Sequence, residues 1–97
     1  MKESTLEALL TREVKAAGGL CIKLPAILYR GIPDRMVLLP GARIFFLELK
    51  TDTGRVSPAQ VRFISFLQSL GFFSDIIRGK SQLLEFLENH VRKDLSR

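Results

Sequence analysis

Glycine and proline divide this chain into short segments, and this punctuation limits the possible folds more than any other feature. They occur at Gly18-Gly19, Gly31 to Pro33, Pro40-Gly41, Gly54, Gly71 and Gly79. Because these residues end helices and form turns, each element between them must be short. The 97 residues provide material for one small core, so we expect a single domain over residues 1–97.

The apolar pattern within the segments predicts the element order α-β-β-β-α-β-α. Leucines at helical spacing indicate a helix over residues 3–17, and Ser57 followed by Pro58 indicates the start of a second helix that ends near residue 70. Short apolar runs predict strands at residues 20–24, 35–39, 43–50 and 72–78. A last helix is expected from Ser81 to about Lys93. This order favours an α/β fold with a single mixed β-sheet flanked by helices.

Composition excludes several classes of protein. No apolar run approaches the ~18 residues of a membrane span, and the N-terminus carries acids where a signal peptide needs an apolar stretch. The single cysteine, Cys21, rules out an internal disulfide and favours the cytoplasm. The net charge of +5 favours a polyanionic partner such as DNA.

The densest chemical pattern is an aspartate at the start of one strand and a Glu-x-Lys at the end of the next. If the two strands pair as a hairpin about Pro40-Gly41, Asp34 comes level with Glu48. Side chains alternate along a strand, so Glu48 and Lys50 share one face. Two carboxylates beside an amine can hold a hard divalent cation through oxygen ligands. Each part alone is common, since Glu-x-Lys is often an exposed ion pair and Pro-Asp a turn, but the joint pattern is more specific.

These residues resemble the PD-(D/E)xK nuclease superfamily, and more narrowly its VRR-NUC domains. The matching stretches are residues 31–41 (GIPDRMVLLPG), 45–50 (FFLELK) and 54–60 (GRVSPAQ). The resemblance implies a restriction-endonuclease-like core and a stand-alone, virus-type domain. It also implies a metal-dependent endonuclease that uses Mg²⁺ or Mn²⁺ to hydrolyse DNA phosphodiester bonds.

The resemblance also implies a role for each site residue. Asp34 and Glu48 would bind the metal together with the backbone carbonyl of Leu49. Lys50 would be the catalytic lysine, and Gln60 on the following helix would contact the substrate or a metal-bound water.

An acid on the first helix usually completes such a site. Glu3 fits the family spacing best and would bind the metal directly or through water, Glu7 is the second choice and Glu13 the third.

Basic residues near the predicted site are candidates for binding DNA phosphates. They are Arg30, Arg35, Lys23, Arg55 and Arg62, with Arg78 and Lys80 as further candidates. His90 and Cys21 are expected to have structural roles, because neither has a partner in the sequence that would suit catalysis.

Ile27, Leu28 and Tyr29 are unusually apolar for a connecting segment. They would pack in the core, form a dimer contact, or place Tyr29 beside a DNA base, and we favour packing or dimerisation over base contact. The surplus of apolar side chains predicts a homodimer. Two sites related by a two-fold axis could cut both strands of a four-way (Holliday) junction, the branched DNA that we expect as substrate.

Two other functions would suit the same chain. A non-catalytic DNA-binding module would keep the basic residues but would not need the carboxylates, lysine and glutamine together. A structural or interaction subunit would bind neither metal nor DNA.

Overall fold

The turn at Pro40-Gly41 connects the two central strands of the sheet. In the computed structural model, which describes residues 1–92, β2 (Arg35–Leu39) and β3 (Arg43–Lys50) pair antiparallel on either side of this turn. Arg35 lies opposite Leu47, so the register is the one predicted from the sequence. Gly41 has a φ of +85°, a conformation that glycine adopts without steric cost.

Two further strands complete a mixed sheet with the order β1-β2-β3-β4. β1 (Leu20–Lys23) pairs antiparallel with β2, and β4 (Phe73–Arg78) pairs parallel with β3. The parallel pair needs a crossover, which α2 (Pro58–Ser69) supplies between the two strands. The predicted α/β fold with one mixed sheet is therefore confirmed.

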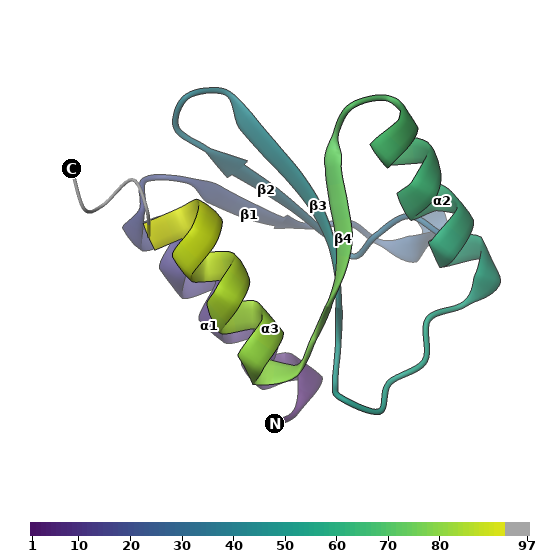
Figure 1. Ribbon diagram of the computed structural model, residues 1–97, viewed down its shortest axis with the longest axis horizontal. Helices are drawn as coiled ribbons and strands as arrows, with labels where there is room; N and C mark the ends of the chain where they lie inside the picture. Colours follow the sequence, from purple (N-terminus) through teal and green to yellow (C-terminus); the bar gives the residue numbers. More distant parts are fainter. Residues whose placement is uncertain (93–97) are drawn as a thin grey trace.

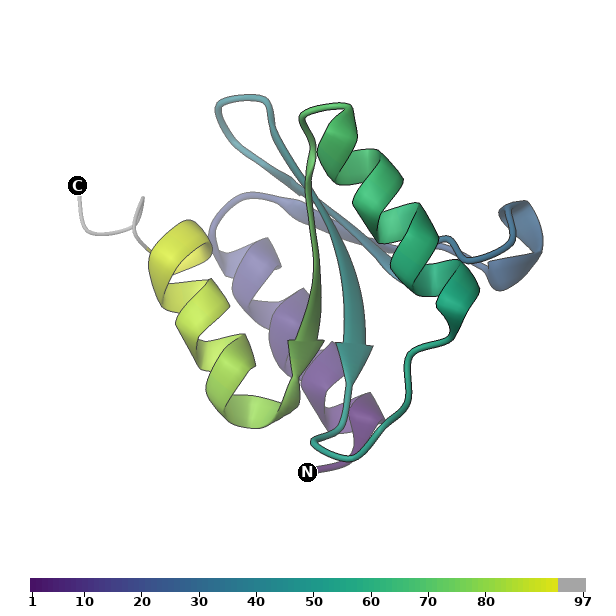
Figure 2. The same cartoon turned by 45° about the vertical axis from the view of Figure 1, so that its right-hand side comes forward.

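The helices cover the two faces of the sheet unequally (Figure 1, Figure 2). α1 (Glu3–Ala16) and α3 (Gly79–Phe86) lie side by side on one face, and α3 continues as a π-helical turn, η2 (Leu87–Val91). α2 lies on the other face and packs mainly along β4. Within residues 1–92, no helix lies on the outer part of that second face, over β1 and β2.

The main core lies between the sheet and the α1/α3 pair. Apolar side chains from α1, β2, β3, β4, α3 and η2 form one buried cluster: Leu6, Leu10, Val14, Val37, Leu39, Phe45, Leu47, Leu49, Ile77, Leu83, Phe86, Leu87 and Val91. Alternate residues of β3 belong to this cluster, so its other residues, Glu48 and Lys50 among them, face the α2 side.

The last helix begins earlier than the sequence predicts. The prediction that Ser81 caps it is wrong, because α3 starts at Gly79 with Arg78 as the capping position. No side chain of the described residues caps the first turn of α3, although the backbone N–H of Arg78 donates to Oε1 of Gln82 at 2.7 Å. Helical structure continues to Val91, and Lys93, the expected end, lies outside the described residues.

The segment between β1 and β2 projects from the sheet. It contains a short 3₁₀ turn, η1 (Ala26–Leu28), and Ile27 is 93% exposed, so the interpretation that this segment packs in the core is wrong for Ile27. The ring of Tyr29 meets the ring of Phe63 on α2 edge-on, with centroids 5.2 Å apart. Gly31 holds the segment against α2, since a Cβ there would lie 2.3 Å from the Ala59 carbonyl oxygen. Within the described residues, no helix has the length and apolar character needed to cross a bilayer.

Candidate metal centre

Two carboxylates meet where β2 begins and β3 ends. Asp34 directly precedes β2, and its backbone N–H donates to Oε1 of Glu48 at 3.1 Å. In return, Oδ1 of Asp34 accepts from the backbone N–H of Leu49 at 3.3 Å. The predicted level position of Asp34 and Glu48 is therefore confirmed, and the main chain at Leu49 lies beside the Asp34 carboxylate.

Glu48 is almost completely buried yet keeps a charged neighbour. Glu48 is 2% exposed, and its Oε2 lies 3.4 Å from the ammonium nitrogen of Lys50. The burial of a carboxylate is unfavourable by several kcal/mol unless partners compensate it. The Lys50 ion pair and the Asp34 N–H together supply that compensation.

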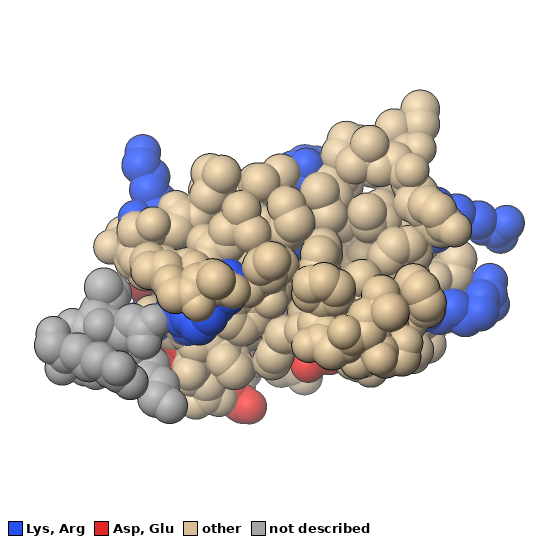
Figure 3. All heavy atoms as spheres, turned by 90° about the horizontal axis from the view of Figure 1, so that it is seen from above, with Lys and Arg blue, Asp and Glu red and all other residues tan. Residues whose placement is uncertain are grey.

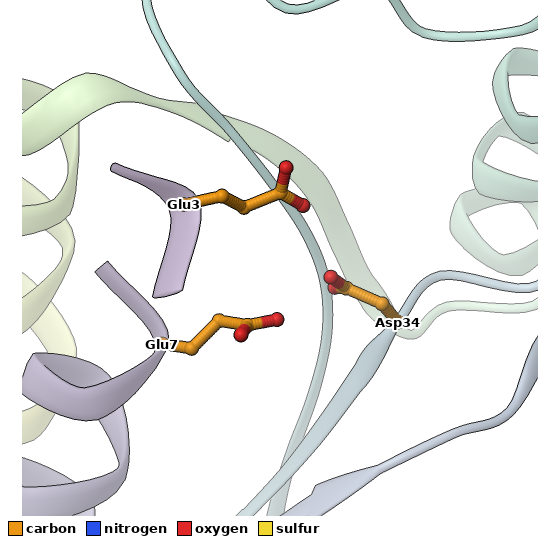
Figure 4. Close-up of side chains that lie close together, drawn as sticks. All are labelled: Glu3, Glu7 and Asp34. Atoms are coloured by element: carbon orange, nitrogen blue, oxygen red, sulfur yellow. The ribbon is translucent and has the colours of Figure 1, made fainter. Parts of the chain in front are cut away.

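α1 brings two further acids to the same place. Glu3 and Glu7 lie one turn apart on the helix, and one carboxylate oxygen from each falls within 4.8 Å of the other and of an Asp34 oxygen. Figure 4 shows all three side chains pointing toward a common centre. The sequence left a choice between Glu3 and Glu7, and the structure brings both together. Glu13 lies elsewhere, in an ion pair with Arg92 at 2.7 Å.

The pKa values of Asp34 and Glu48 are raised. Burial, with a smaller contribution from the charge of Glu48, raises the pKa of Asp34 from 3.8 to about 7. Burial also raises the pKa of Glu48, and the neighbouring Lys50 opposes that rise. Because burial opposes the ionisation of Asp34 and Glu48, a cation that neutralises their charge would stabilise them.

The donor set matches a hard divalent metal ion. Every candidate ligand atom in the cluster is a carboxylate oxygen, and no histidine or cysteine belongs to it within the described residues. Oxygen-only sets suit Mg²⁺, Mn²⁺ and Ca²⁺, whereas zinc and copper sites usually include nitrogen or sulfur ligands. The residues present therefore fit the kind of metal expected from the sequence.

Gln60 forms a capping box, which the sequence analysis missed. Its Oε1 accepts from the backbone N–H of Ser57 at 2.9 Å, while its own backbone N–H donates to the Ser57 hydroxyl at 3.1 Å. The signal was present, because Ser followed three residues later by Gln is the pattern of this motif. The box uses the amide oxygen of Gln60 and not its NH₂ group.

The basic residues divide into two groups. Arg35 has a side chain that is only 12% exposed, and it pairs with Glu7 at 3.1 Å, so it orients a candidate metal ligand. Arg78 donates to the carbonyl oxygen of Gly54 and so fixes the loop that follows β3. The remaining predicted cations are exposed: Lys23, Arg30, Arg55, Arg62 and Lys80. Basic side chains also project at the end of the molecule where α2 and residues 24–33 lie (Figure 3, right).

Cys21 and His90 occupy structural positions. Cys21 is half-buried in β1 beside the core, and burial raises the pKa of its thiol, which disfavours the nucleophilic thiolate. The His90 ring lies 4.9 Å from Phe73 and 5.1 Å from Phe86, between centroids, on the side of the sheet covered by α3.

Comparisons with known sequences and with solved structures agree with each other. No family model matches the chain. A protein described as "Putative nuclease p44", from Acyrthosiphon pisum secondary endosymbiont phage 1, is 37% identical over 71 residues, which are 73% of this chain and 76% of the phage protein. A solved structure of a VRR_NUC domain has a TM-score of 0.82 and 26% identity, over 91% of this chain and 96% of that one.

Proposed function

Because this chain belongs to the VRR-NUC family, we propose that it is a metal-dependent endonuclease that hydrolyses phosphodiester bonds in branched DNA. One observation carries the proposal: Glu3 and Glu7 of α1 gather with Asp34, the backbone of Asp34 meets Glu48, and Glu48 pairs with the ammonium group of Lys50. Four carboxylates so near one another, with an amine beside the buried one, have no evident structural purpose at the rim of a small domain. They match what phosphodiester hydrolysis requires, namely metal ligands and a donor of a proton or hydrogen bond.

The metal ligands would come from three parts of the chain. Asp34, Glu48 and the carbonyl of Leu49 would hold Mg²⁺ or Mn²⁺ on the strand side. Glu3 would complete the site from α1, directly or through water, and Glu7 is close enough to share this role. When bound, such an ion lowers the pKa of water and neutralises charge on the scissile phosphate.

Lys50 and Gln60 would act on the substrate side. The Lys50 side chain is 19% exposed beside Glu48, and its ammonium would donate a hydrogen bond or proton to a phosphate oxygen as negative charge develops. The free NH₂ group of Gln60 would orient the attacking water or a phosphate, while its oxygen keeps the start of α2 capped.

Branched DNA and a homodimer are the finer parts of the proposal. Apolar side chains lie on the part of the α2-side sheet face that no helix of residues 1–92 covers: Leu20, Ile22, Met36, Leu38 and Ile44. Leu20 and Ile44 are exposed, and a second copy packed on this face would bury them. A two-fold dimer would present two metal centres to a four-way junction. By analogy with the phage relative, such an enzyme would act in the cytoplasm of the host cell.

The test is a cleavage assay on labelled four-way junction, flap, duplex and single-stranded DNA, with Mg²⁺, Mn²⁺ or EDTA. We expect metal-dependent cleavage by the wild type and none by Lys50→Ala. Lys15→Ala is the matched control, since Lys15 is an exposed lysine about 18 Å along α1 from Glu3. Paired nicks in the junction would support the dimeric enzyme.

The same assay can contradict the proposal. Cleavage by Lys50→Ala at the wild-type rate would overturn the site assignment. Salt-sensitive junction binding without cleavage in any metal would instead favour the non-catalytic DNA-binding module.

A further inference from the structure

A hollow lies between the segment that precedes β2 and α2, outside the metal centre. Its volume is about 550 Å³, within the range of small-molecule sites. It is lined by Tyr29, Arg30, Ala59, Arg62, Phe63 and Phe66. None of these residues takes part in the metal centre.

We propose that this hollow binds an unpaired nucleobase of the DNA substrate, with the two arginines on the adjoining phosphates. The inference rests on the proposed function, because it takes DNA as the substrate. It adds a substrate feature that the metal centre alone does not define, a nucleotide outside the base-paired stack.

The aromatic side chains of the hollow are open to a ligand. Tyr29 is 66% exposed and Phe66 is 57% exposed, which is unusual for aromatic residues in a domain with so small a core. Tyr29 meets Phe63 edge-on, so this contact leaves faces of the Tyr29 ring uncovered. Every nucleobase has a flat face that stacks on such rings, whatever its sequence.

The charges around the hollow match a nucleotide. Arg30 and Arg62 are both exposed, and neither forms an ion pair with an acid in residues 1–92. Both also line a neighbouring hollow that contains Ser57 and Gln60 at the start of α2. The arginines therefore stand between an apolar hollow and a helix N-terminus, an arrangement that suits a base on one side and a phosphate on the other.

A second copy of the chain fits this hollow less well. The chain carries a net charge of +5, so a copy placed here would bring further positive charge toward Arg30 and Arg62. DNA neutralises both arginines. The open sheet face described above has no such cluster of arginines and remains the proposed dimer contact.

The position of the hollow implies a base close to the cleaved bond. Arg30 precedes Asp34 by four residues, a span of at most about 14 Å. Gly31 fixes this short connection, because its φ of +85° and its contact with Ala59 leave no space for a side chain. A base inside a duplex has both faces covered by its neighbours, so only an unpaired base offers a face to Tyr29.

The experiment measures binding of DNA that carries one unpaired nucleotide at a junction, with EDTA present to prevent cleavage. A second DNA has an abasic site at that position. We expect the wild type to bind the base-containing DNA about 5- to 100-fold more tightly than the abasic DNA. Tyr29→Ala and Phe66→Ala should remove this preference, and Tyr29→Phe should keep it. Val61→Ala, an exposed α2 residue outside the hollow, is the matched control.

Each outcome separates this inference from the proposed function. A wild type that cleaves DNA but binds both DNAs equally would overturn the base site and leave the nuclease intact. A base preference that depends on Tyr29, in a protein that cleaves nothing, would support the base site and overturn the nuclease. If Tyr29→Ala changes the sedimentation of the free protein from dimer to monomer and leaves the preference unchanged, the hollow is an interface between copies and the inference is wrong.

Discussion

At the end of β3, residues on both faces of the strand are buried, but with opposite effects on stability. Leu47 and Leu49 lie under α1 and α3 with no exposed surface, and their burial stabilises the fold. Glu48, between them in sequence, is 2% exposed on the other face, where burial raises its pKa and opposes its charge. One strand thus has a stabilising face, where apolar side chains are buried, and a strained face, where the carboxylate of Glu48 is buried at a cost in free energy. The packing of the stabilising face keeps the strained face in position.

Truncating a side chain on the stabilising face should have the largest effect on stability. Leu47→Ala should lower the free energy of unfolding by about 2–5 kcal/mol, because it leaves a cavity in the main core. Urea unfolding followed by circular dichroism would measure the loss. Ile44→Ala, on the open face of the same strand, should cost less than about 1 kcal/mol. Equal losses in the two variants would refute the difference between the faces.

Substituting Asp34, the acid that lies against the strained face, should reduce activity and leave the stability of the fold largely unchanged. Asp34→Asn should reduce metal-dependent cleavage at least about 100-fold, because the amide is a poor ligand for a hard cation. The amide oxygen can still accept the Leu49 N–H, so the fold should persist. Single-turnover cleavage and circular dichroism would be compared with those of Lys15→Ala. Unfolding of Asp34→Asn would show instead that Asp34 is needed for the hairpin.

The acids should also make the metal-free protein less stable as the pH rises. The pKa of Asp34 is about 7 in the folded state and near 3.8 when unfolded, so the folded protein binds more protons between these values. Its stability should therefore fall by about 1–3 kcal/mol from pH 4 to pH 8. Thermal unfolding in EDTA would measure this fall, which Asp34→Asn should reduce.

A metal ion sharpens this pH test. Mn²⁺ binds the ionised carboxylates of the folded state, so it should raise the unfolding temperature more at pH 8 than at pH 5. If burial does not raise the pKa of Asp34, the unfolding temperature in EDTA should stay the same across this pH range. That result would remove the contrast between the two faces.

Much of the strained face could be predicted from sequence because strand geometry is regular. The turn at Pro40-Gly41 fixes the register of the hairpin, and the register places Asp34 level with Glu48. Alternation then separates Leu47 and Leu49 from Glu48 and Lys50. These features depend on local spacing, which the sequence contains.

The remaining parts depend on how distant elements pack. The sequence could not choose between Glu3 and Glu7, because the position of α1 on the sheet decides which acids reach Asp34. At the start of α3, Gly79 leaves room for Asp52, whose carboxylate oxygen would lie 2.0 Å from a Cβ at that position. No local pattern indicates that contact.

The smallest expected effect on stability concerns the capping box at the start of α2, which includes Gln60. Ser57→Ala should lower the free energy of unfolding by about 1 kcal/mol, because Gln60 loses the acceptor for its backbone N–H. Differential scanning fluorimetry would detect the loss, with Ser65→Ala, an exposed serine within α2, as the control. If cleavage falls further than this stability change explains, the capping box also positions Gln60 for the substrate. If cleavage is unchanged, the capping box serves the helix alone, and any contact of Gln60 with the substrate does not depend on it.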